Sequence, residues 1–476
     1  MKTIRGRFRA AVLMGAAASV LVFAGGAKAQ NQNSNGNASS NDNTWPYAPA
    51  GNSPVLAVVG DIACQPGAEA TDESPKETCT DPKAPYYGSN SSPAGGIAPA
   101  GPPYSLWNSQ ESTANQIEAM KPDAVALLGD LQYQVGRYSD FEQSFDLTYG
   151  AFKFLHRPAP GNHEFYDEHS ETGVNGYGYF SYYNGFQIYT ETNPATGVTA
   201  GQPVTTTIMD PCPSDPACGP GATPTADLPA QPIPRADGQA GHFELGGSGG
   251  VDGTGVGEGW YSYNLGSWHL ISLNIECSTQ PGGCDPTGLW FSAELAWLQN
   301  DLEQNHAACT LAYWHQPTFS ATNGITPEGI AAQNFWKLLY QYKADLVLNG
   351  HDHLYAHYRP LDPNGNHDAK KGITEFIVGT GGETLDPVVV TPVTSGSTAT
   401  TAEDPSGNPD FNEENLIKAV GGYWGVMALT LESNSYKWDF ESALEAPAAI
   451  VTMNGQYPVA ATPGATYSDK GSGTCH

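Results

Sequence analysis

Short apolar runs recur along this chain, and most of them end directly at a polar residue or at a glycine followed by one. Runs of this kind predict strands that are buried on both faces. They occupy residues 55–59, 125–128, 310–314 and 345–348. Alternating segments at 260–265 and 269–275, joined by Gly266 and Ser267, predict a β-hairpin. Further strands are predicted at 374–378, 424–431 and 436–440.

In much of the chain between these runs, the apolar residues recur at the spacing of a helix. It predicts helices at 109–120, 139–154, 292–304 and 327–342. In the second of these helices, Phe141, Phe145 and Leu147 are expected on roughly one face. Because strands alternate with helices, the pattern indicates an α/β fold, in which the segment from Asp61 to Asp130 forms a β-α-β unit with a right-handed crossover.

Three stretches rich in Pro, Gly, Ser or Thr interrupt this pattern, at about 65–105, 165–258 and 385–412. Long segments without a core pattern usually form lids or rims over a site. We expect them to be insertions in one domain at 54–445. A flexible leader rich in Asn, Ser and Gly is predicted at 30–53, and a C-terminal tail at 446–476.

The first 29 residues have the pattern of a secretory signal peptide, with basic residues, an apolar run and a small-residue site ending at Ala29. We therefore expect a secreted or periplasmic protein. The whole chain has 20 basic and 49 acidic residues; without residues 1–29 the balance is 15 to 49, a formal net charge of −34. So acidic a surface repels nucleic acid and anionic membranes, and we expect neither as a partner.

Eight cysteines, an even number in a chain that carries an export signal, predict disulfides. A zinc cluster is the weaker alternative, because no CxxC spacing occurs. Three pairs are close in sequence and are predicted to be bonded: Cys64 with Cys79, Cys212 with Cys218, and Cys277 with Cys284. The two cysteines that remain, Cys309 and Cys475, are predicted to form the fourth bond. The last pair would tie the tail to the core.

Side chains that can bind metal follow the predicted strands or lie in glycine turns. They are Asp61, Asp130, Tyr133, Asn162, His315, His351 and His353. Taken singly, each has an ordinary interpretation, since Gly-Asp pairs often cap helices or make turns. Open α/β sheets place their chemistry at the carboxyl ends of strands, so these side chains are expected to lie together. His351 and His353, two residues apart in an extended segment, would share one side of the strand and could serve two neighbouring cations.

Five sequence blocks carry a family resemblance: GDIA (60–63), GDLQY (129–133), GNHE (161–164), AYWH (312–315) and GHDH (350–353). As a set they resemble the motifs of the calcineurin-like metallophosphoesterases and, within that superfamily, the purple acid phosphatases. The resemblance implies a four-layer αββα sandwich. It also implies an enzyme that hydrolyses a small phosphorylated substrate, a phosphomonoester.

The resemblance further implies two metal ions bridged by Asp130. Asp61, Tyr133 and His353 are expected at one ion, and a second set is expected at the other, namely Asn162, His315 and His351. A phenolate ligand favours a hard trivalent ion, so Fe(III) beside a divalent Fe, Zn or Mn is the implied pair. Such a pair binds phosphate oxygens and activates a water or hydroxide for in-line attack.

His163 is expected to contact the phosphate and to stabilise or protonate the leaving oxygen. The alternative is a positioning role, in which His163 orients Asp61 or another ligand. The further histidine that the family usually has about ten residues after the position of His315 is missing here. His169 and His242 are weaker candidates for a leaving-group acid. His357 is expected to be a surface histidine.

The implied ligands do not fix the class of ester. A phosphodiesterase or nucleotide pyrophosphatase of the same superfamily is therefore an alternative, which the rim of the pocket would decide. A secreted binding protein that retains the fold without activity is a second alternative. It is disfavoured because every ligand position holds a competent side chain.

Overall fold

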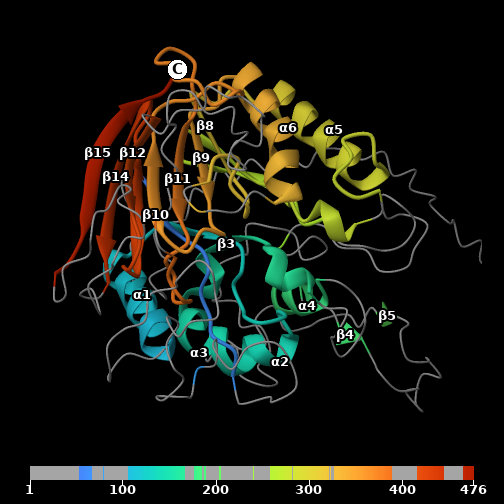
Figure 1. Cartoon of the computed structure of the whole chain (residues 1–476), viewed down its shortest axis with the longest axis vertical. Helices are drawn as coiled ribbons and strands as arrows, with labels where there is room; N and C mark the ends of the chain where they lie inside the picture. The colour runs from blue at the N-terminus through green and yellow to red at the C-terminus, as the bar shows by residue number, and fades with distance from the viewer. Residues whose placement is uncertain are drawn as a thin grey trace, which may run out of the picture. The chain divides into compact units, whose positions relative to one another are not determined.

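The computed structural model describes residues 53–66, 79, 106–166, 176–184, 187–188, 203–204, 240, 258–280, 282–320, 322, 326–386, 388, 415–443 and 465–476. Two large sheets and their helices confirm the α/β class (Figure 1). Across these ranges no helix has the length and apolar character to cross a bilayer. The predicted signal peptide, His169, His242 and the Cys212–Cys218 pair lie outside the described residues.

The first sheet has six strands in the order β15-β14-β13-β1-β2-β3. β1, β2 and β3 run parallel to one another, and β13, β14 and β15 extend the sheet with antiparallel pairs. The bounds are β1 (Val55–Val59), β2 (Ala124–Leu128), β3 (His156–Ala159), β13 (Gly425–Leu431), β14 (Ser435–Ser442) and β15 (Ser468–Thr474).

The second sheet has seven strands in the order β12-β10-β11-β9-β8-β7-β6. β7, β8, β9 and β11 are parallel, and the others pair antiparallel. The bounds are β6 (Tyr261–Leu265), β7 (Trp268–Ser272), β8 (Cys309–Tyr313), β9 (Leu346–Asn349), β10 (Tyr355–Tyr358), β11 (Thr374–Val378) and β12 (Leu416–Val420). β6 and β7 confirm the predicted hairpin. A separate pair consists of β4 (Gln187–Ile188) and β5 (Pro203–Val204).

The alternation of side chains along each buried strand produces the layers. In β1, Leu56 and Val58 pack in the core between the two sheets, whereas Ala57 and Val59 belong to the core on the outer face. α1 (Leu106–Met120) and α4 (Tyr177–Asn184) contribute to that outer core. On the second sheet, α5 (Leu289–Gln304) and α6 (Pro327–Gln341) cover the outer face. Helix, sheet, sheet and helix follow one another, as the predicted αββα sandwich requires (Figure 1).

The helix predicted at 139–154 is broken into short pieces. They are α2 (Tyr138–Asp140), a π turn (Phe141–Phe145), α3 (Asp146–Tyr149) and a 3-10 segment (Gly150–Leu155). Phe141 and Phe145 are buried, but Leu147 is 64% exposed, so its predicted place on the same face is wrong. Side chains two residues apart on a helix point in directions that differ by about 200° around the axis, so Leu147 points away from Phe145.

Three predicted disulfides are confirmed: Cys64–Cys79, Cys277–Cys284 and Cys309–Cys475.

The prediction of a surface His357 is wrong, because this residue lies in β10 and is only 5% exposed. Its Nδ1 is 3.2 Å from a carboxylate oxygen of Asp469 in β15, and its ring stacks on Phe376. The sequence pattern does not predict β10, and so it does not predict this burial.

Candidate metal centre

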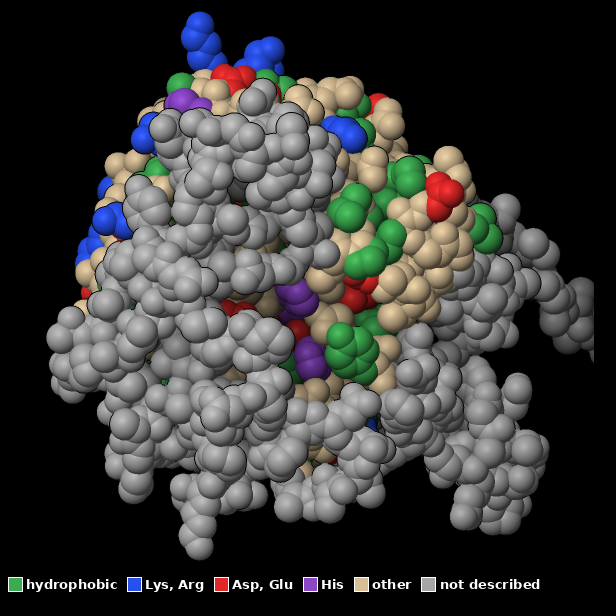
Figure 2. Space-filling view, viewed as in Figure 1, with side chains coloured by type: hydrophobic (Ala, Val, Ile, Leu, Met, Phe, Trp, Pro, Cys, Tyr) green, Lys and Arg blue, Asp and Glu red, His purple; other side chains and the backbone are tan. Residues whose placement is uncertain are grey.

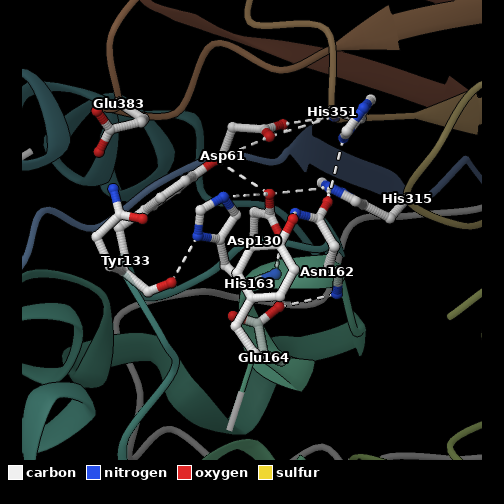
Figure 3. A network of polar contacts seen from close by, with 12 residues as sticks. Asp61, Asp130, Tyr133, Asn162, His163, Glu164, His315, His351 and Glu383 are labelled. Carbon is white, nitrogen blue, oxygen red and sulfur yellow. Dashed lines mark hydrogen bonds and ion pairs between the residues drawn. The ribbon is translucent and has the colours of Figure 1, made fainter. Parts of the chain in front are cut away.

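The predicted ligands lie together where strands of both sheets end (Figure 3). Asp61, Asp130 and Asn162 come from the turns after β1, β2 and β3 of the first sheet. His315 follows β8, and His351 follows β9, in the second sheet. Segments far apart in sequence therefore meet at one edge of the sandwich, as expected for the carboxyl ends of parallel strands.

Asp130 is the centre of the arrangement. Its Oδ2 atom is 3.2 Å from the Tyr133 hydroxyl and 3.0 Å from Nε2 of His315. Its Oδ1 atom accepts a hydrogen bond of 2.8 Å from the backbone N–H of His163. One carboxylate oxygen thus lies within reach of two separate groups of polar side chains.

The first group contains Asp61, Tyr133 and His353. The Tyr133 hydroxyl is 3.1 Å from Oδ1 of Asp61 and 3.0 Å from Nε2 of His353. Nε2 of His353 is in turn 3.3 Å from the same Asp61 oxygen. Two oxygen donors and one nitrogen donor therefore face a common point beside Asp130.

The second group contains Asn162, His315 and His351. The Asn162 Oδ1 atom is 3.1 Å from Nε2 of His315 and 3.2 Å from Nδ1 of His351. One ligand atom each from Asp130, His315 and His351 lies within 4.8 Å of the other two. This group again mixes oxygen and imidazole nitrogen donors.

The backbone at three of these residues is left-handed. Asp61, Asp130 and His351 have φ angles of 60°, 48° and 68°. This conformation costs a residue with a Cβ atom roughly 1–2 kcal/mol and tends to be retained at functional sites. A glycine precedes each of the three, and at Gly129 (φ 87°) an added Cβ would lie 2.6 Å from the His315 ring. The Gly-Asp and Gly-His pairs thus allow both the turn and the close approach.

Backbone carbonyls fix the orientation of the imidazoles. His315 donates from Nδ1 to the carbonyl of Leu128 at 2.8 Å, and His353 donates from Nδ1 to the carbonyl of Thr384 at 2.5 Å. Each ring therefore presents Nε2 to the cluster. A metal-binding histidine typically has this arrangement, because the second nitrogen holds the ring in place.

The pKa shifts within the cluster show that positive charge stabilises its buried carboxylate. Burial opposes the ionisation of Asp130, but His315 and then His163 outweigh it and hold the pKa of Asp130 well below its usual range. Burial likewise opposes the protonation of His315, whose pKa is nevertheless raised by the Asp130 carboxylate. At His351, burial and then His315 lower the pKa to about 3. Cations bound to the same atoms would replace the protons that now balance the carboxylates.

The donor set fits two cations. Two carboxylates, a phenol, an amide oxygen and three imidazoles converge, and Asp130 lies between the two groups. Carboxylate, phenolate and imidazole together suit iron, zinc and manganese. The roles of the individual ligands stay predictions.

His163 lies beside the cluster rather than inside it. Its Nδ1 is 2.6 Å from the carbonyl oxygen of Gln134, and its Nε2 is 3.8 Å from Oδ2 of Asp130 (Figure 3). In the described part of the chain, its ring makes no hydrogen bond to Asp61. The side chain is 16% exposed, whereas Asp130 and His315 are almost fully buried. His163 is therefore partly open to solvent. Figure 2 shows histidine side chains beside acidic and hydrophobic ones on one face of the molecule.

Glu164 is a contributor that the sequence reasoning missed. Its Oε1 accepts the backbone N–H groups of Leu131 and Gln132 at 2.8 and 3.1 Å, and its Oε2 accepts that of Gly161 at 2.8 Å. The side chain thus joins the turn that carries Asp130 to the turn that carries Asn162. Burial, followed by the charge of Asp130, raises the pKa of Glu164 to about 8.

Glu276 is a second missed residue. It follows β7, the neighbour of β8, and is 1% exposed. Neither of its carboxylate oxygens has a hydrogen bond of normal length within the described ranges. Burial raises its pKa well above the usual value, against the opposing charge of His315. Glu276 directly follows the strand predicted at 269–275, so the signal that identified Asp130 was present here too.

The comparisons with known sequences give partial matches. No protein-family model matches the chain. An uncharacterized protein of Mycobacterium tuberculosis is 30% identical over 112 residues, 21% of each chain. Purple acid phosphatase 15 of Arabidopsis thaliana is 28% identical over 115 residues, 22% of this chain and 20% of that protein. The match therefore spans about a fifth of the length of these curated relatives.

Solved structures give longer matches at low identity. A purple acid phosphatase from yellow lupin seeds has a TM-score of 0.42 and 15% identity, covering 83% of this chain and 52% of its own. A dimetal phosphatase from Danio rerio has a TM-score of 0.37 and 12% identity, covering 82% and 97%. GAP50, the anchor in the inner membrane complex of Plasmodium, has a TM-score of 0.40 and 10% identity, covering 83% and 86%. The class that the fold and the site themselves define is an α/β sandwich with a candidate two-metal centre.

Proposed function

We propose that this chain is an exported, dinuclear metal-dependent phosphatase that hydrolyses phosphomonoesters. The single observation that carries the proposal is the position of Asp130. Its Oδ2 atom lies 3.2 Å from Tyr133 in one donor group and 3.0 Å from His315 in the other, as a bridging ligand requires. Fe(III) at the Tyr133 group and divalent Fe, Zn or Mn at the other are the proposed ions.

Two cations held there would supply the positive charge that binds phosphate oxygens and acidifies a water molecule. The proton for the leaving oxygen would come from a residue of the chain itself. His163, when protonated, keeps one N–H on the Gln134 carbonyl and presents the other at Nε2. As the ester P–O bond breaks, this proton passes to the departing oxygen, so that an alcohol rather than an alkoxide leaves.

The proposal is tested on the mature protein reconstituted with iron and zinc. Metal content is measured together with turnover of 4-nitrophenyl phosphate and of bis(4-nitrophenyl) phosphate. We expect about two ions per chain and a clear preference for the monoester. An Asp130→Asn variant should lose metal and activity, whereas the surface variant Asp285→Asn should retain both.

The two alternatives are distinguished in the same experiment. A preference for the diester would support a phosphodiesterase or nucleotide pyrophosphatase instead. A protein that binds two ions per chain and hydrolyses neither ester would support a binding protein without catalytic activity.

A further inference from the structure

Tyr166 is the residue that the proposed mechanism leaves without a role. Among the described residues, the large hydrophobic side chains with substantial exposure are Leu147, Tyr166, Leu289, Ile330 and Ile417. Of these, Tyr166 is the one that contacts the candidate metal centre. It directly follows the turn formed by Asn162–Phe165 and is 45% exposed.

Two contacts hold the Tyr166 ring in place. Its hydroxyl accepts a hydrogen bond of 2.7 Å from the side-chain amide nitrogen of Asn162. Its ring packs against the ring of His163, with 4.8 Å between the centroids and an angle of 65° between the planes. Both partners belong to the GNHE block, so the ring is fixed to the centre itself.

The hydrogen bond to Asn162 anchors that side chain at its amide nitrogen. The amide oxygen faces His315 and His351, at 3.1 and 3.2 Å. An amide oxygen can bind a cation, whereas an amide NH₂ group cannot. Tyr166 therefore holds Asn162 in place while its oxygen faces the cluster, as a metal ligand requires.

Two tyrosine rings pack against His163: the buried ring of Tyr133, with 4.2 Å between the centroids, and the ring of Tyr166, which is 45% exposed, with 4.8 Å. In the proposed mechanism, Nε2 of His163 gives its proton to the departing oxygen. Of the two rings, the exposed one is therefore the one that a leaving group beside His163 could contact.

We propose that Tyr166 is both a positioning residue for Asn162 and an aromatic wall for the leaving group, so that the preferred substrates are phosphoesters of aromatic alcohols. This inference rests on the proposed function. A ring that is already fixed loses little conformational freedom when a second ring packs on it. Aromatic pairs of this kind favour binding by roughly two- to tenfold over area burial alone.

The test for the aromatic wall uses two esters of similar leaving-group chemistry, benzyl phosphate and cyclohexylmethyl phosphate. Both release a primary alcohol, and the rings have the same number of carbon atoms, so the ratio of kcat/KM reports ring recognition. The metal-loaded native protein should prefer the benzyl ester by about fivefold. Tyr166→Phe should keep that preference because it keeps the ring, and Tyr166→Leu should abolish it. Leu147→Ala, at an exposed residue outside the centre, is the matched control and should not alter the ratio.

The positioning role has its own readout, which needs no turnover. Titration of the metal-free variants should show that Tyr166→Phe binds the second equivalent of Zn²⁺ about tenfold more weakly than the native protein, since the hold on the Asn162 amide is lost. Unchanged Zn²⁺ affinity in Tyr166→Phe would overturn the positioning role.

Failure of the inference and failure of the proposed function give different results. If the metal-loaded native protein hydrolyses both esters equally well, or if Tyr166→Leu keeps the native ratio, the aromatic wall is refuted and the phosphatase stands. If the protein with two ions per chain hydrolyses neither ester, the proposed function itself is refuted. Binding of benzylphosphonate and cyclohexylmethylphosphonate, measured by calorimetry, checks the ring preference independently of turnover.

Discussion

The side chain of Glu164 is predicted to hold the two halves of the candidate metal centre together. It accepts three backbone N–H groups, two from the turn that contains Leu131 and Gln132 and one from Gly161. The change Glu164→Gln keeps an oxygen for the first turn but places an NH₂ group opposite the N–H of Gly161. A glutamine nitrogen cannot accept a hydrogen bond, so one buried donor is left unpaired.

The size of the effect follows from that single bond. Because the pKa of Glu164 is about 8, the side chain is largely neutral at pH 7, and the loss is that of a buried donor left without a partner, about 1–3 kcal/mol. We therefore expect Glu164→Gln to lower the free energy of unfolding of the metal-free protein by about 1–3 kcal/mol at pH 7. Because the turns of Asp130 and Asn162 are then no longer tied, metal affinity should fall by about 10- to 100-fold.

Urea unfolding of the metal-free protein measures the first quantity, and metal titration measures the second. Glu142→Gln, which changes an exposed carboxylate, is the control and should alter the free energy of unfolding by less than about 0.5 kcal/mol. If Glu164→Gln unfolds at the same urea concentration as the native protein and binds both ions as tightly, the bridging role of Glu164 is wrong.

Four further outcomes are expected. His163→Ala should lower kcat by about 10²–10⁴-fold with metal content near native; loss of metal would instead indicate a positioning role. Tyr133→Phe should remove the visible absorption of the iron-loaded protein, and an unchanged spectrum would exclude the phenol as an iron ligand. Burial raises the pKa of Glu294 well above 4.5, so the folded state keeps a proton that the unfolded chain releases, and the free energy of unfolding falls as the pH rises. The melting temperature of Glu294→Gln should therefore gain on the native value between pH 5 and pH 8, and a constant difference would contradict this. Cys309→Ser should lower the free energy of unfolding by about 2–5 kcal/mol, because Cys309 and Cys475 are 166 residues apart; equal stability would refute this.

The strands that the sequence predicts are those that are apolar on both faces. β1 and β2 are buried along nearly their whole length, so no polar residue interrupts their pattern. β3 (HRPA) and β15 (SDKGSGT) lack such a run, and β15 alternates between exposed and half-exposed residues at the edge of its sheet. Such edge strands are formed by pairing with a neighbour, which local composition does not encode.

The candidate ligands could be predicted because their residue types and their place after strands are both local properties. The roles of Glu164 and Tyr166 could not, because each depends on a partner that only the fold brings near. Glu164 acts through backbone N–H groups 32 and 33 residues away, and every residue has such a group. The inferred role of Tyr166 depends on the packing of its ring against His163, and the sequence does not specify the geometry of that contact.

The Cys309–Cys475 bond fastens the sandwich at the edge opposite the candidate centre. Cys475 directly follows β15 of the first sheet, and Cys309 begins β8 of the second, whose other end leads to His315. Because Asp130 and His315 come from different sheets, any sliding of one sheet over the other would pull the two donor groups apart. The bond thus joins the two sheets covalently, and we expect its reduction in the folded protein to weaken cation binding before it unfolds the chain.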